Sequence, residues 1–167
     1  MTDAHSYIFA LSFAAALGCG LMAGIFFAFS NFVMRAFARI APAQGIAAMQ
    51  AVNITVLNPL FLSAFMGTAV LCAADVAMAL MFGSGNTAYL VAGSALYLLG
   101  NIGVTAAFNV PMNEALAAVD AGQTDAVQIW KHYLDKWTFW NHVRTITALA
   151  AAAAFTLALA GNPVIST

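Results

Sequence analysis

The sequence predicts an all-α protein, an integral membrane antiparallel four-helix bundle with short amphipathic helices at its cytoplasmic end. Hydrophobic residues make up 63% of the 167 residues, and charged residues only 7%. Soluble domains carry about a quarter charged residues, so a surface with this few charges must lie largely in lipid. Four apolar stretches of spanning length, and the position of every Lys and Arg at one end, complete the prediction.

Each apolar stretch approaches or exceeds the ~20 residues that cross a bilayer core. We expect the spans at about residues 7–34, 57–82, 88–110 and 139–160. The first span is too long for the apolar region of a signal peptide, and no Lys or Arg precedes it, so we expect it to be retained. Little chain is left over, so residues 1–167 are expected to form a single four-span domain.

The positive charges predict the orientation of the bundle. Arg35 and Arg39 follow the first span, Lys131 and Lys136 precede the fourth, and Arg144 lies just inside the fourth. Because successive spans alternate in direction, all five lie at one end, which the positive-inside bias assigns to the cytoplasm. We therefore expect a protein of the bacterial inner membrane with both termini outside the cytoplasm.

The first connection at this end is expected to hold a short interfacial helix at about residues 44–52. Pro42 stands near its first position, where the missing N–H of proline costs nothing. Asn58 is a suitable N-cap for the second span, because Pro59 follows it directly.

The second connection is expected to hold two further short helices. One begins near Pro111 and ends at Gly122, a residue that favours helix C-termini. The other has Thr124 as its N-cap and extends to Trp137 before the fourth span begins.

Polar side chains recur at the charged end of every span, whereas the outer halves of the spans are almost purely apolar apart from Asp75. Polar groups in lipid are costly, so polar groups that several helices place at one depth usually line a shared cavity. The inner polar residues are Ser30, Asn31 and Arg35, then Asn53, Thr55 and Asn58, then Asn101, Thr105, Asn109, Asn113 and Glu114, and finally Asn141 and Arg144.

Helical spacing predicts which side chains of the fourth span face this cavity. Trp137, Asn141 and Arg144 (i, i+4, i+7) share one face, with Trp140 at its edge, whereas His142 points almost oppositely. We expect Arg144 to face the interior and to contact an amide of the third span, with Asn109 as the partner.

Simpler explanations exist for single residues. Interfacial tryptophans anchor spans at headgroup depth, and an arginine one turn deeper can extend back to the headgroups. Asparagines in membrane bundles often only hydrogen-bond one helix to another. The convergence of asparagine amides and Arg144 from four helices favours a binding cavity over these alternatives.

Other chemistry finds little support in the sequence. Cys19 and Cys72 fall in mid-span, where a thiol behaves as a small apolar group, and no motif for zinc, dinucleotide or nucleotide binding occurs. No metal site and no cofactor are therefore predicted. A haem or copper site held by His132 and His142 is a minority alternative, since only these two histidines can approach each other. The Gly20–Gly24 GxxxG pair is expected to allow close helix packing.

Four segments resemble the anthrone oxygenase-like family of small bacterial and fungal membrane proteins. They are GLMAGIFFAFSNFVM (20–34), AQGIAAMQAVN (43–53), FNVPMNEALAAVD (108–120) and WTFWNHVRT (137–145). The resemblance implies a four-span bundle, and it implies oxidation of anthrones to anthraquinones, as in the named fungal members. The residues that match the family's motifs are Asn109, Pro111, Asn113, Trp137, Trp140, Asn141 and Arg144.

An anthrone-type reaction assigns roles to the inner polar residues. Loss of a proton beside the ketone gives an enolate that reacts with O2 as co-substrate, and cationic or amide donors would stabilise its oxygen. The candidate catalytic residues are Arg144, Asn141, His142 and Glu114, of which His142 and Glu114 are the candidate bases. The candidate substrate-binding residues are Asn109, Asn113, Trp137, Trp140, Asn31, Asn58 and Asn101.

The expected partners are the lipid bilayer and a small aromatic or amphiphilic molecule, and a homo-oligomer stays open. Nucleic acid is excluded as a partner, because the chain has no basic tract and a net charge of −1. Two other functions also stay open: a binder or carrier of an amphiphile such as a quinone, or an accessory membrane subunit.

Overall fold

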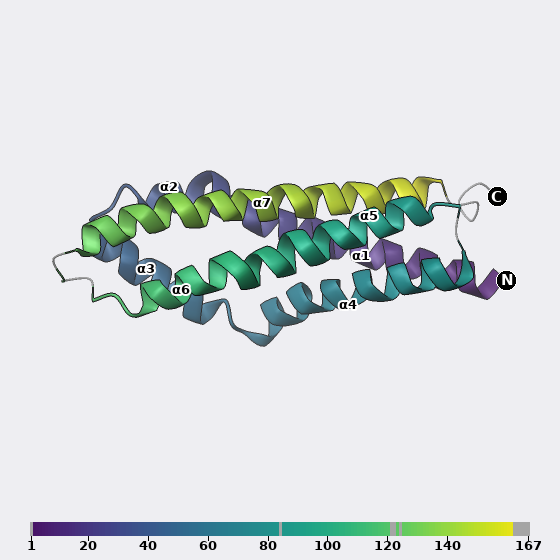
Figure 1. Ribbon diagram of the computed structural model, residues 1–167, viewed down its shortest axis with the longest axis horizontal. Helices are drawn as coiled ribbons and strands as arrows, with labels where there is room; N and C mark the ends of the chain where they lie inside the picture. Colours follow the sequence, from purple (N-terminus) through teal and green to yellow (C-terminus); the bar gives the residue numbers. More distant parts are fainter. Residues whose placement is uncertain (1, 84, 121–122, 124, 162–167) are drawn as a thin grey trace.

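A computed structural model gives the structure of residues 2–83, 85–120, 123 and 125–161, and this part of the chain is helical without any strand. The prediction of an all-α protein is therefore confirmed. Four helices are long and apolar enough to cross a membrane: His5–Phe37, Pro59–Phe82, Thr87–Ala117 and Ala126–Ala160. They lie side by side along the long axis, and successive helices run in opposite directions (Figure 1).

Two of these four long helices contain π-helical turns. The first consists of α1 (Thr2–Ala28), the π-helical η1 (Phe29–Val33) and α2 (Met34–Phe37). The third consists of α5 (Thr87–Tyr97), the π-helical η2 (Leu98–Gly103) and η3 (Thr105–Asn109), and α6 (Val110–Ala117). The remaining helices are α3 (Pro42–Thr55), α4 (Pro59–Phe82) and α7 (Ala126–Ala160).

The second connection differs from the expectation of separate short helices. α6 continues the third long helix beyond residue 110, and α7 runs from Ala126 through the fourth span without a break. Pro111 lies in the first turn of α6, directly after a π-helical turn that already interrupts the α-helical bonding pattern, so its missing N–H does not end the helix. No Gly or Pro separates residues 126 and 139. The expected cap at Thr124 and end at Gly122 lie outside the described residues.

The start of α4 and the start of α3 agree with the sequence prediction. The Asn58 side chain accepts a hydrogen bond of 3.0 Å from the backbone N–H of Phe61, and Pro59 begins the helix. Pro42 occupies the first turn of α3. At the other end of α4, Gly83 has a φ of 70°, which a residue without a side chain adopts freely.

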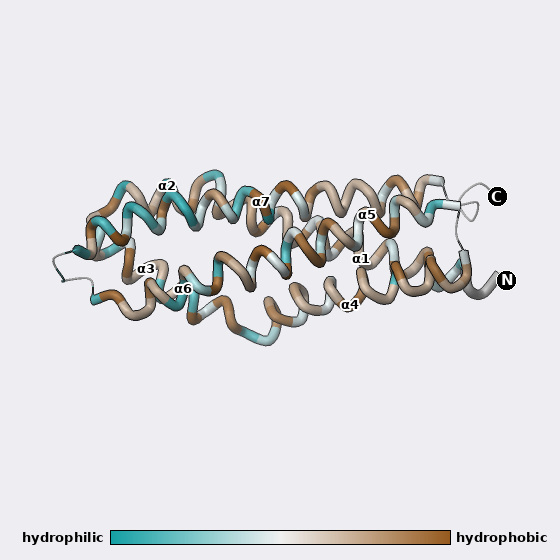
Figure 2. Tube along the Cα trace, viewed as in Figure 1, coloured by the Kyte–Doolittle hydropathy of each residue, from teal (hydrophilic) through white to brown (hydrophobic). Residues whose placement is uncertain are grey.

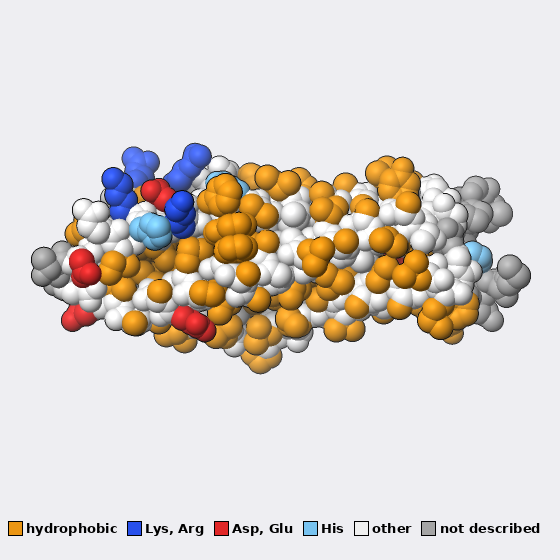
Figure 3. Space-filling model, in the orientation of Figure 1, with side chains coloured by type: hydrophobic (Ala, Val, Ile, Leu, Met, Phe, Trp, Pro, Cys, Tyr) orange, Lys and Arg blue, Asp and Glu red, His pale blue; other side chains and the backbone are white. Residues whose placement is uncertain are grey.

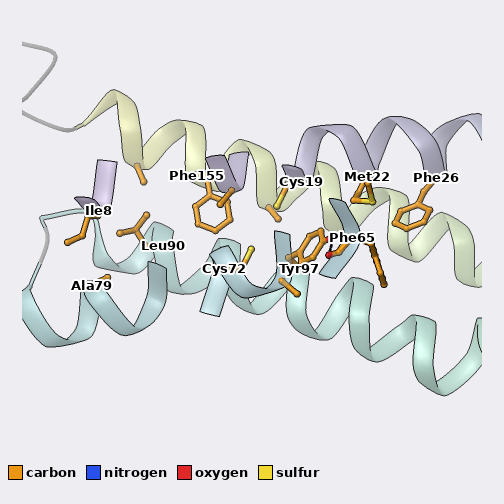
Figure 4. Packing of buried hydrophobic residues seen from close by; sticks show 14 residues of the cluster. Ile8, Cys19, Met22, Phe26, Phe65, Cys72, Ala79, Leu90, Tyr97 and Phe155 are labelled. Carbon is orange, nitrogen blue, oxygen red and sulfur yellow. Dashed lines mark hydrogen bonds between the residues drawn. The ribbon is translucent and has the colours of Figure 1, made fainter. Parts of the chain in front are cut away.

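The outer half of the bundle is filled by a buried apolar cluster. Its side chains come from α1, α4, α5 and α7 and extend from Ile8 to Phe26 and Phe65 (Figure 4). The Tyr97 hydroxyl inside this cluster donates to the backbone carbonyl of Phe65 at 3.0 Å. Asp75 is fully buried, and its carboxylate accepts from the Ser12 hydroxyl at 2.8 Å.

A second buried cluster closes the charged end. It joins α2, α3, α6 and α7 through apolar and aromatic side chains: Met34, Ile46, Met49, Leu116, Ala126, Trp130, Tyr133 and Trp137. Hydrophilic residues concentrate around this end of the Cα trace, whereas hydrophobic ones dominate the rest (Figure 2). On the visible face the charged side chains also gather there (Figure 3). The positive-inside bias predicts that this end faces the cytoplasm.

The closest helix contacts occur at glycines other than the GxxxG pair. A methyl group added at Gly18 would meet the Thr68 side chain, and one added at Gly100 would meet Thr147. Nothing lies within 4 Å of the corresponding positions at Gly20 and Gly24, so the expectation for this pair is wrong. The spacing marks a face that a helix can approach, but α4 contacts the neighbouring face of α1, which carries Gly18.

Replacing Gly18 with Ala is expected to destabilise the bundle, because the new methyl group overlaps the Thr68 side chain. Overpacking of this kind costs about 1–3 kcal/mol. The matched control is Gly20→Ala on the same helix, where the added methyl meets open space. Thermal unfolding in detergent should separate the two variants, and equal stabilities would contradict the close contact of α1 with α4.

Candidate functional site

A cavity of about 660 Å³ lies between the two buried clusters. Side chains of α1, α3, α4, η3, α6 and α7 line it, so all four long helices contribute. Its walls are mostly apolar, and five aromatic side chains take part: Phe26, Phe29, Phe61, Phe65 and Trp137. The volume falls within the range of small-molecule sites, roughly 300–1,000 Å³.

Arg144 is the buried cation of this cavity, with only 6% of its surface exposed. Its Nη2 donates to Asn141 Oδ1 at 2.7 Å, and its Nη1 donates to the Thr105 hydroxyl at 3.2 Å. The guanidinium also lies over the rings of Phe26 and Trp137, 4.4 and 5.2 Å from their centroids. Arg144 therefore faces the bundle interior, as expected, rather than the headgroup layer.

The partner expected for Arg144 in the third helix was the wrong one. The contact is the hydroxyl of Thr105, whereas the amide nitrogen of Asn109 donates to the backbone carbonyl of Trp137 at 3.4 Å. The antiparallel register explains the difference. Thr105 lies level with Arg144, whereas Asn109 lies about one turn nearer the charged end, level with Trp137.

Asn141 fixes the position of Arg144 relative to α1. Its amide nitrogen donates to the Phe26 carbonyl and to the Ser30 hydroxyl, both at 2.7 Å, while its oxygen accepts from Arg144. The Phe26 carbonyl stands just before the π-helical turn η1, where the regular backbone pattern is interrupted. The interruption and the amide thus belong to one arrangement that holds the guanidinium in place.

Three buried polar atoms around the cavity have no hydrogen-bond partner among the described residues: Asn53 Nδ2, Asn109 Oδ1 and Arg144 Nε. All three belong to residues that line the cavity. The Asn53 amide lies beside the Tyr133 hydroxyl, which can serve as its partner. The unused hydrogen-bonding capacity therefore lies with the Asn109 and Arg144 atoms. Buried polar groups are nearly always satisfied, so the cavity wall is where the described residues leave hydrogen-bonding capacity unused.

Asn113 holds the aromatic wall of the cavity. Its Oδ1 accepts from the Tyr133 hydroxyl and from the Trp137 indole N–H, both at 2.8 Å. Tyr133 and Trp137 are stacked, and both are buried. The spacing of α7 indicated the facing of Trp137, but nothing in the sequence indicated that Tyr133 shares its acceptor.

Replacing Asn113 with Leu should leave the Tyr133 and Trp137 donors without an acceptor. Buried unsatisfied donors cost about 1–3 kcal/mol each, so we expect a lower unfolding temperature and a blue-shifted tryptophan emission. Asn31→Leu is the control, since Asn31 is exposed and does not line the cavity. Equal stability of the two variants would show that Asn113 does not hold the wall.

The remaining candidate residues divide into those at the cavity and those away from it. Glu114 lines the cavity and is exposed, so it stands at the edge. Asn101 is buried against the Thr147 hydroxyl at 3.2 Å and does not line the cavity. Trp140 stacks on Phe108, with ring centroids 3.5 Å apart, and does not line it either.

Three other candidates lie away from the cavity. Asn58 is exposed, and both ends of its amide are used in the cap, where its Nδ2 donates to the Thr55 carbonyl. Asn31 and His142 line a separate surface pocket of about 150 Å³, together with Arg35. Within η1, Ser30 is buried and its neighbour Asn31 is exposed.

The two histidines considered for a metal or haem do not converge. His132 and His142 are both exposed on one continuous helix. Ten residues of α-helix separate them by roughly 15 Å along the axis, which is too far for both to coordinate one metal ion. In the part of the chain that the structure describes, no three His, Cys, Asp or Glu side chains form a cluster that could hold a metal.

The sequence model of the anthrone oxygenase family matches residues 58–154, more than half of the chain. The chain belongs to the anthrone oxygenase family. The matched region includes η3, α6 and the whole cavity-facing part of α7, whereas the resembling segments at 20–34 and 43–53 lie before it. Comparisons with curated proteins and with solved structures gave no match. Family membership suggests an oxygenase-type function in an integral membrane protein.

Proposed function

We propose that the protein is a membrane-embedded oxygenase that oxidises an enolisable aromatic ketone of the anthrone class inside the cavity. The supporting observation is the buried guanidinium of Arg144, which lines a cavity with aromatic walls and whose Nε–H has no hydrogen-bond partner among the described residues. The other two guanidinium nitrogens are held by Thr105 and Asn141, so the group is fixed before any ligand binds. A preorganised donor in a dry site is the arrangement that stabilises a developing oxyanion.

The proposed reaction begins with loss of one proton from the methylene carbon next to the aromatic rings. The resulting enolate carries its charge on the ketone oxygen, which the Arg144 guanidinium would stabilise. The carbanionic carbon then adds O2 to give a hydroperoxide. Loss of water from that hydroperoxide leaves a second carbonyl, so one oxygen atom stays in the quinone and the other leaves with the two methylene hydrogens.

Glu114 is the base that this proposal favours. It lines the cavity and is exposed at its edge, so it can pass a proton to solvent. His142 belongs to the separate surface pocket, on the other side of α7 from Arg144. Glu114→Gln should therefore lower turnover while His142→Gln should not, and O2 is the proposed co-substrate.

The proposal is tested by O2 consumption of the purified protein in vesicles with anthrone as substrate. We expect uptake of one O2 per anthrone and formation of anthraquinone, at a rate well above that of vesicles with protein denatured beforehand. The denatured sample matters because anthrones oxidise slowly by themselves. Equal rates in the two samples would reject the oxygenase.

A non-catalytic binder or carrier of a quinone is the second candidate. The Arg144 guanidinium in the cavity wall favours any ligand that offers an acceptor oxygen, as a quinone does, whether or not it reacts. Saturable binding of anthraquinone without O2 uptake would support this alternative over the oxygenase.

A further inference from the structure

The cavity reaches the protein surface between α4 and the inner part of the third long helix. Within the span, three of its lining residues are also exposed: Leu62 by 38%, Met66 by 49% and Val110 by 39%. Towards the charged end the exposed lining residues are Ile54, Leu57, Glu114 and Ala117. Extensive packing of α4 against the third helix is confined to α5 and η2, so it stops before η3 and α6. The deeper part of the opening is therefore rimmed by apolar side chains, and Glu114 lies nearer the charged end.

This opening lies within the membrane-spanning region rather than at the end of the bundle. Leu62 and Met66 stand on either side of Phe65, in the first two turns of the α4 span. The Phe65 ring packs edge-on against Phe26 with centroids 6.2 Å apart, and Phe26 lies directly under the Arg144 guanidinium. The rim and the proposed oxyanion donor thus share one depth in the bundle.

The route from the charged end is blocked by the second buried cluster. Met49 and Trp137 belong both to that cluster and to the cavity wall, and Ile46 and Leu116 behind them are almost fully buried. The Gln50 side chain ties α3 to the end of α6 with hydrogen bonds to the Leu116 and Val119 carbonyls. Apolar packing therefore closes the route along the bundle axis, and among the described residues the cavity meets water only at the edge where Glu114 is exposed.

We propose that the cavity is loaded sideways from the bilayer, through the gap rimmed by Leu62, Met66 and Val110, and that it accepts uncharged polycyclic amphiphiles dissolved in lipid. The oxygen of such a molecule enters first and meets Arg144, while its apolar part fills the aromatic walls. A charged, water-soluble molecule would have to cross hydrocarbon to reach the same gap, which is costly. The inference rests on the proposed function only for the identity of the natural substrate.

Covalent labelling of a cysteine placed in the cavity tests this route without any turnover. Thr105→Cys puts a thiol of similar size beside Arg144, and the natural cysteines Cys19 and Cys72 are fully buried. The protein is held in phosphatidylcholine vesicles and exposed either to N-(1-pyrenyl)maleimide, which is neutral and polycyclic, or to a stilbene disulfonate maleimide. The thiol sulfur adds to one alkene carbon of the maleimide and its proton goes to the other.

We expect the neutral reagent to label the thiol and the disulfonate to leave it unlabelled. Leu62→Trp and Val110→Trp should each slow neutral labelling about tenfold or more, a rise of about 1.4 kcal/mol in the barrier. The matched controls, Leu80→Trp on α4 and Leu99→Trp on η2, alter exposed leucines that do not line the cavity and should label at the parent rate. If Leu62→Trp or Val110→Trp lowers the unfolding temperature, Met66→Trp is used in its place.

The inference is overturned if the rim variants label as fast as the controls, or if the disulfonate labels as fast as the pyrene reagent. Absence of labelling by both reagents also rejects it, provided that the thiol reacts after unfolding in detergent. Rim-dependent labelling without O2 uptake would reject the oxygenase and keep the lateral route. Anthrone oxidation at the parent rate in the rim variants would support the oxygenase and reject the lateral route.

Discussion

Arg144→Gln is expected to lower the turnover of anthrone on the order of a hundredfold or more, the usual loss when one oxyanion donor is removed. The substitution removes the charge and the guanidinium donors of a side chain that lines the cavity. Arg144→Lys should cost less, because the charge stays although the planar fork that reaches Thr105 and Asn141 is lost. O2 uptake and unfolding temperature are measured on the same preparations.

Arg35→Gln is the matched control for this prediction. Arg35 is an exposed cation that lines the small surface pocket and not the cavity, so its loss should leave turnover unchanged. An Arg144→Gln variant as active as the parent would remove Arg144 from the mechanism. A variant that cannot be purified in folded form would favour the accessory-subunit alternative, in which the arginine only holds the bundle together.

The direction in which a side chain points could be predicted where the helix is regular. α7 is a continuous α-helix, and the spacing of Trp137, Asn141 and Arg144 correctly placed all three on its buried, cavity-lining face. The same spacing set His142 on the opposite face, where the structure has it exposed. Composition and span length were enough for the fold class, because so apolar a chain has few alternatives.

Prediction failed where it depended on the level of a residue along the bundle. Asn101, Thr105 and Asn109 all contact α7, but Asn101 lies opposite Thr147 and does not line the cavity. Asn31 follows the buried Ser30 in η1 and is exposed, so it does not line the cavity either. The register of neighbouring helices sets these levels, and it comes from tertiary packing that spacing along one helix does not contain.

The sequence also could not predict which aromatic side chains line the cavity. Phe61 and Phe65 come from a helix whose every face is apolar, so periodicity does not distinguish the side that meets the cavity from the side that meets lipid. Only the packing of α4 against α1 and α5 decides this. The GxxxG pair failed for the same reason, since a helix with many small residues offers several faces for close approach.

Asn141→Leu is expected to damage both the bundle and the site. It removes two hydrogen bonds to α1 and takes the Asn141 partner from the Phe26 carbonyl and from one Arg144 nitrogen, while the Ser30 hydroxyl keeps Thr145. Each unsatisfied buried group costs about 1–3 kcal/mol, so the unfolding temperature should fall clearly. Turnover should fall as well, because the guanidinium loses the contact that orients it.

The double variant Asn141→Leu with Arg144→Met separates these two effects. Replacing a buried polar pair by apolar side chains of similar size is often neutral for stability, whereas removing one member is not. We therefore expect the double variant to regain stability relative to Asn141→Leu alone and to stay inactive. Purely additive losses would mean that the two side chains act independently, and they would remove Asn141 as the residue that positions Arg144.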